Sequence, residues 1–220
     1  MKTKTTKSSI RSALSKGRSL VLALVVVCCA VCSCLGSETA PRHRYYRLPI
    51  HKNLDRAEET LPVVYRVEEF EVAPAYDHLR IVYRVSPFEL RHYGYRQWVT
   101  KPGRLVADSI REYAELSGHF ETVTEGPTPV ADYTVQGRVD VIEEVDKKKH
   151  WFAHMVLSLR LIRSSDGKIL WSSRFDETVR VKKRRPKHIV AGLTKVLRKA
   201  TEKLITSSVE LIRKDRAGKE

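Results

Sequence analysis

The only thiols of this sequence belong to four cysteines that lie within seven residues: Cys28, Cys29, Cys32 and Cys34. A disulfide framework for the rest of the chain is excluded, because no cysteine follows position 34. A zinc site built from all four thiolates is also disfavoured, since the segment is an apolar run without the polar loop and remote ligand pair of zinc ribbons. The thiols must therefore serve another chemistry, and the residues before them indicate which one.

A basic leader and a short apolar stretch precede these cysteines. Residues 1–18 are rich in Lys, Arg, Ser and Thr, and residues 20–31 are almost entirely apolar. This is the order of a secretory signal peptide. The apolar run of about 12 residues is shorter than the roughly 20 that a membrane-spanning helix needs. We therefore predict a cleaved export signal over residues 1–33.

The sequence Val31-Cys32-Ser33-Cys34 resembles the bacterial lipobox, which has an aliphatic residue three positions before the cut and a small residue directly before it. In that chemistry the sulfur of the last cysteine receives a diacylglycerol, and the new amino terminus can then be acylated. Two or more acyl chains anchor a protein stably, whereas one is marginal. We predict that Cys34 is lipid-modified, and Leu35 after it resembles the enterobacterial pattern for sorting to the outer membrane. An ordinary signal peptide is the alternative.

The net charge of +15 is divided unevenly along the chain. The first 33 residues supply six of these charges and contain no Asp or Glu, which leaves nine on the exported part. Such a surplus suits either nucleic acid or anionic lipid as a partner. Export favours lipid, and we predict no nucleic-acid partner.

Periodicity predicts an α+β domain, a mostly antiparallel sheet packed with two helices. Residues 102–117 have a helical apolar stripe, and Gly118 is a natural stop for this helix. Residues 186–214 have a second stripe, whose members are Ile189, Leu193, Val196, Leu197, Ala200, Leu204, Ser208 and Leu211. Residues 34–44 form a lipidated tether, 45–214 the domain and 215–220 a polar tail. Alternating apolar residues predict strands at 45–48, 63–72, 79–85, 88–95, 120–123, 133–141, 151–162 and 169–175. The strand at 63–72 is expected to contain a break or a bulge.

Two groups of side chains are candidates for contact with partners. The aromatics Tyr83, Phe88, Tyr93, Tyr95 and Trp98 could line an apolar groove or an interface, although core packing is the favoured interpretation for most of them. A basic run of Lys182, Lys183, Arg184 and Arg185 could contact anionic headgroups or an acidic partner, or form a solvated loop.

No catalytic, metal or cofactor site is predicted. Glu143, Glu144 and Asp146 are interpreted as an exposed, charged strand end, because neighbouring strand positions point to opposite faces and no nucleophile accompanies them. His150 and His154 are interpreted as residues of a solvent-facing strand surface, too far apart to chelate a metal ion.

Several short pieces, taken in order, resemble the ABC-type transport auxiliary lipoprotein family, which accompanies mammalian-cell-entry (MCE) type lipid transport systems. The pieces are Tyr45-Tyr46-Arg47-Leu48, Val72-Ala73-Pro74-Ala75-Tyr76, Ile81-Val82-Tyr83-Arg84, Phe88-Glu89-Leu90 with Tyr93 and Tyr95, Trp98, Gly118-His119-Phe120, and Asp166-Gly167 before Leu170-Trp171. The sequence departs from the family in a longer loop at residues 50–60 and in the basic run.

The resemblance implies a domain like the amino-terminal domain of TolB and a set of partners. These are an MCE-domain protein, an ABC permease and an ATPase, with a lipid as a possible ligand and the membrane reached through the lipid anchor. The ATPase motif belongs to another subunit, and this chain has no Gly-x-x-x-x-Gly-Lys-Ser/Thr loop. The alternatives are a lipoprotein of similar fold that binds glycan or protein without a transporter, and an exported hydrolase, for which no catalytic signature is found.

Overall fold

Alternating apolar residues build three long strands, β7 (Tyr133–Lys147), β8 (His150–Arg163) and β9 (Ile169–Val181), which pair antiparallel as a meander. The computed structural model describes residues 42–50, 54–127, 130–147, 149–183 and 185–218. The turn between β8 and β9 contains Gly167 with φ of 72°, as the turn residues of the sequence predict. Strands β7 and β9 are longer than predicted and continue past their alternating apolar residues into charged sequence.

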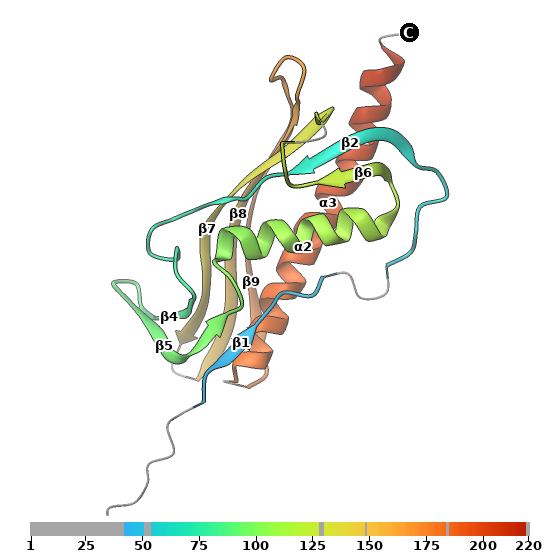
Figure 1. Cartoon of the computed structure of the whole chain (residues 1–220). Helices are drawn as coiled ribbons and strands as arrows, with labels where there is room; N and C mark the ends of the chain where they lie inside the picture. Colours follow the sequence, from blue (N-terminus) through green and yellow to red (C-terminus); the bar gives the residue numbers. More distant parts are fainter. Residues whose placement is uncertain (1–41, 51–53, 128–129, 148, 184, 219–220) are drawn as a thin grey trace, which may run out of the picture. The chain divides into compact units, whose positions relative to one another are not determined.

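The other edge of β7 pairs in parallel with three short strands that follow one another along the chain (Figure 1). They are β2 (Leu61–Val67), β3 (Glu71–Val72) and β4 (Arg80–Ser86). The predicted break in the second strand is confirmed between β2 and β3. It places the ring of Phe70 against Gly137, where any Cβ would lie 2.6 Å from that ring.

Two small extensions complete the sheet, which has nine strands in the part of the chain that the structure describes. Strand β6 (Phe120–Thr124) pairs in parallel with β2, while β4 pairs antiparallel with β5 (Glu89–Trp98), which pairs in parallel with β1 (Arg44–Tyr46). The predicted α+β class is confirmed, and the long ladders are antiparallel as expected. The short parallel pairs make the sheet mixed, which the sequence did not predict.

The helix α2 (Pro102–Ser117) lies against β2, β3, β6 and β7. Its bounds match the prediction, because Pro102 suits the first turn and Gly118 adopts φ of 69° just after the last one. All residues of the predicted apolar stripe are buried: Val106, Ile110, Tyr113, Ala114 and Ser117.

The helix α3 (Pro186–Ala217) lies against β8 and β9 and also touches α2 (Figure 1). The predicted stripe is correct up to Ser208, but its last member is wrong: Ile212 is buried, whereas Leu211 is only partly so. The stripe drifts because 3.6 residues per turn do not repeat on a fixed spacing over so long a helix. Both helices and the sheet share one core, so residues 42–220 form a compact unit with its own interior.

Trp98, at the end of β5, is 1% exposed and belongs to that core. Trp98→Ala is therefore expected to lower the free energy of unfolding by about 3–5 kcal/mol, because it removes a large buried ring and leaves a cavity. Urea denaturation measures this loss. Tyr95→Ala on the same strand is the control, since Tyr95 is 50% exposed and its truncation should cost about 1 kcal/mol or less. Equal losses for the two variants would contradict the assignment of Trp98 to the core.

Candidate functional site

The sheet carries a groove of about 620 Å³ on the face opposite the helices, between β4, β7, β8 and β9. Its walls combine apolar side chains, Val85 and Val145, with Pro87 from the turn after β4. The size lies in the range of ligand sites in proteins, about 300–1,000 Å³. We call this hollow the Glu143 groove, after the carboxylate in its lining.

Glu143 is completely buried and accepts hydrogen bonds on both of its carboxylate oxygens. Arg84 donates from Nε to Oε1 at 2.8 Å and from Nη2 to Oε2 at 3.2 Å. The Tyr76 hydroxyl donates to Oε2 at 2.7 Å, and Nδ1 of His154 lies 3.0 Å from Oε1. A buried carboxylate is tolerated only when it is paired and hydrogen-bonded in this way.

His154 is held from both sides, because its Nε2 lies 3.0 Å from Oδ1 of Asp176 on β9. The hydrogen bond to Glu143 raises the pKa of His154 against the opposing effect of partial burial, and the bond to Asp176 raises it further. Burial pushes the pKa of Glu143 upward, but hydrogen bonds from His154, Tyr76 and Arg84 outweigh this and hold it below its usual value. The groove therefore favours a charged Glu143 and a charged His154.

The arrangement is suited to binding rather than to proton transfer. A general base needs a lone pair within reach of the substrate. Both oxygens of Glu143 already accept from three side chains, and both ring nitrogens of His154 face carboxylates. Among the described residues there is no group of three side chains that could hold a metal ion.

The interpretation of Glu143 and Glu144 as an exposed strand end is wrong. Their exposures are 0% and 1%, because β7 continues to Lys147 and lies between β4 and β8. The two carboxylates do point to opposite faces: Glu143 faces the groove, and Glu144 accepts a hydrogen bond of 2.7 Å from the Tyr93 hydroxyl. His154 is likewise half-buried and bound by carboxylates, while His150 is exposed. Alternation in a strand predicts the opposite faces, but no local signal reveals the strand that covers this edge.

The five candidate aromatics fall into three environments. Phe88, in the turn between β4 and β5, is 98% exposed, and Tyr95 is exposed on β5. Tyr83 and Tyr93 are half-buried and contact each other with ring centroids 4.8 Å apart. Trp98 is a core residue, so its inclusion among the candidate contact residues is corrected.

The basic run lies between β9 and α3. Lys182, Lys183 and Arg185 are exposed, and Arg184 lies outside the described residues. The predicted signal and Cys34 also lie outside the described part of the chain. No helix within that part is long and apolar enough to cross a membrane.

Comparison with known families decides the class of protein. Residues 46–204 match the model of the ABC-type transport auxiliary lipoprotein component. The chain belongs to this family. An auxiliary lipoprotein of this kind is a protein of the cell envelope, and the family description implies association with ABC transporter components but no catalytic role.

Solved structures share the fold of this auxiliary lipoprotein. Protein XCC0632 from Xanthomonas campestris, of family DUF330, aligns with a TM-score of 0.69 and 20% identity over 79% of this chain and 99% of its own. A second structure, described as an uncharacterized protein, aligns with a TM-score of 0.59 and 14% identity over 74% of this chain and 97% of its own. No curated protein matches the sequence.

Proposed function

We propose that this auxiliary lipoprotein is a lipid-anchored, non-enzymatic component of an MCE-associated ABC transport system that moves lipids or other apolar molecules across the envelope. The observation that carries the proposal is the Glu143 groove. Part of its lining is apolar, and the ionisable side chains in the rest of the lining hydrogen-bond to one another. Such a site can hold a ligand or a partner segment, while its acid and base groups are already occupied. Binding and docking are therefore the activities that it supports.

The anchor in this proposal is Cys34, with the domain facing the periplasm and the outer membrane preferred over the inner one. The lipobox-like sequence and Leu35 support this placement. A membrane-tethered domain searches only the space near its membrane, which raises its effective concentration at a transporter partner.

The partners in this proposal are an MCE-domain protein, a permease and an ATPase. Phe88 and Tyr95 are the candidate contact residues that the fold leaves exposed, and Tyr95 is the one offered to these partners. Tyr83 on β4 and Tyr93 on β5 contact each other. Aromatic side chains that are exposed in the free protein are common anchors of interfaces.

A pull-down from detergent extracts, followed by mass spectrometry of proteins and lipids, tests this function. We expect the three transporter subunits to co-purify with the wild-type chain, and the Tyr95→Ser variant to recover about tenfold less of them. Val130→Ser is the matched control, because Val130 is 86% exposed but lies before β7, away from these strands. Recovery of glycan or an unrelated protein without any transporter subunit would replace the proposal with the alternative binding function.

A further inference from the structure

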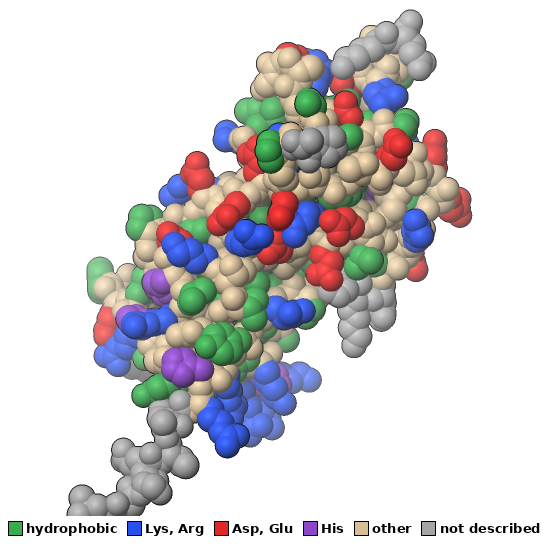
Figure 2. All heavy atoms as spheres, viewed as in Figure 1, with side chains coloured by type: hydrophobic (Ala, Val, Ile, Leu, Met, Phe, Trp, Pro, Cys, Tyr) green, Lys and Arg blue, Asp and Glu red, His purple; other side chains and the backbone are tan. Residues whose placement is uncertain are grey.

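One end of the domain gathers exposed cations. The turn between β7 and β8, the end of β9 and the start of α3 meet there, and Figure 2 shows Lys and Arg side chains clustered at this lower end of the molecule. We call it the basic end. Its exposed cationic side chains are Lys147, Lys149, Arg180, Lys182, Lys183, Arg185 and Lys187.

Three of these cations have no carboxylate partner among the described residues. Elsewhere cations pair with carboxylates, for example Arg138 with Glu71 and Lys199 with Glu177. At the basic end Lys149, Arg180 and Lys182 line a hollow of about 320 Å³ whose lining contains no Asp or Glu. Within the described residues none of these three cations forms an ion pair, so the end attracts anions.

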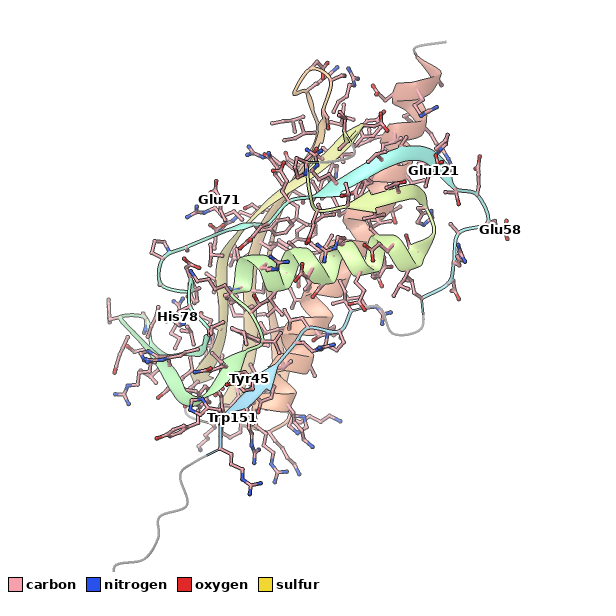
Figure 3. All side chains as sticks on the ribbon, in the orientation of Figure 1. Tyr45, Glu58, Glu71, His78, Glu121 and Trp151 are labelled. Carbon is pink, nitrogen blue, oxygen red and sulfur yellow. The ribbon has the colours of Figure 1, made fainter. Side chains whose placement is uncertain are left out.

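The chain also enters the domain at the basic end. Strand β5 runs away from the β4–β5 turn, and β1 runs parallel to it with Arg44 opposite Arg96. Arg42 and His43 therefore lie on the side of β1 that faces that turn, which shares the Glu143 groove with Lys147. Figure 3 shows Tyr45 and Trp151 at this same end. The tether from Leu35 to Arg42 spans at most about 28 Å, so a lipid on Cys34 would keep this end near the membrane.

An exposed apolar side chain completes the surface. Phe88 stands at the tip of the β4–β5 turn with 98% of its surface in water. A phenyl ring in that position gains free energy by entering the boundary between headgroups and acyl chains, provided that nearby cations meet the phosphates.

We propose that the basic end docks on the anionic lipid surface of the membrane that holds the anchor, with Phe88 inserted and the cations against headgroup phosphates. This inference rests on the lipid anchor of the proposed function but not on the transporter. The Glu143 groove, lined by Pro87 and Lys147, then opens beside the lipid surface.

Vesicle binding tests this docking. The chain from residue 34 onward is prepared with Cys34→Ser, so that no acyl chain contributes, and sedimented with phosphatidylcholine vesicles with or without phosphatidylglycerol. We expect binding only to the vesicles that contain phosphatidylglycerol, weakened by salt. The triple variant Lys149→Ser, Arg180→Ser, Lys182→Ser should bind about a hundredfold more weakly, and Phe88→Ser about tenfold.

The matched controls remove the same groups elsewhere. Arg160→Ser, Lys168→Ser, Lys203→Ser takes three exposed cations from other parts of the surface, and Val130→Ser takes an exposed apolar side chain. Both should retain binding within about threefold of wild type. Equal binding to neutral vesicles, or equal losses in the two triple variants, would overturn the docking surface. Because the vesicles contain no transporter, these outcomes are independent of the pull-down.

Discussion

Replacing Cys34 with Ser is expected to move nearly all of the protein from the membrane fraction to the soluble fraction of salt-washed cells, with the domain still folded. The reason is that the sulfur of Cys34 is the proposed attachment point of the diacylglycerol, and two or more buried acyl chains provide anchoring that salt cannot reverse. Residues 42–220 hold their own core, so the loss of the anchor should leave the unfolding transition unchanged. Fractionation followed by immunoblotting measures the first effect, and urea denaturation the second.

The salt wash separates the anchor from the docking surface. In low salt the Cys34→Ser protein should keep some membrane association through the basic end, and salt should remove it. Cys32→Ser is the control and should stay anchored, because its thiol would leave with the signal. A Cys34→Ser protein that stays on the membrane after salt washing would contradict lipid attachment at Cys34. Release of Cys32→Ser from the membrane would instead indicate that Cys32 carries the lipid.

Local signals predicted a large part of the fold. The bounds of α2 follow from Pro102, the apolar stripe and Gly118, all of which act within the helix itself. The meander of β7, β8 and β9 follows from alternation and turn residues between neighbours in sequence. Such features need no knowledge of distant segments.

The remainder depends on pairings between distant segments. Nothing in the sequence near β2, β3 and β4 shows that they share one edge of β7, more than 50 residues away along the chain. The candidate site depends on that pairing: Arg84 and Tyr76 reach Glu143 only because β4 covers it. From sequence alone, Glu143 and Glu144 could form an exposed strand end or could each join a buried hydrogen-bond network. Which of the two occurs depends on the strands that pair with β7.

Glu143→Ala is expected to lower the free energy of unfolding by about 3 kcal/mol. Removing one partner of a buried ion pair typically costs about 3–5 kcal/mol, because the remaining charge stays buried without compensation. The lower end applies because the side chain of Arg84 is 33% exposed and can turn toward water. Glu177→Ala is the matched control: its carboxylate pairs with Lys199 at the surface, where such a pair contributes about 1 kcal/mol or less. Urea denaturation near neutral pH compares the two, and equal losses would contradict a structural role for the buried network.

The pH dependence of the free energy of unfolding of the same two variants tests whether Glu143 and His154 are charged in the folded protein. The lowered pKa of Glu143 gives stability that is present above the usual glutamate pKa and lost as acid protonates the folded protein. The raised pKa of His154 gives stability that is present below the usual histidine pKa and lost as alkali deprotonates it. The wild-type contribution should therefore be greatest in weakly acidic solution, between those two ordinary values. Glu143→Ala removes the lowered carboxyl pKa and the acceptor chiefly responsible for the raised pKa of His154. Its stability should therefore fall less than that of wild type when the pH moves below or above this interval, whereas Glu177→Ala should keep the wild-type profile.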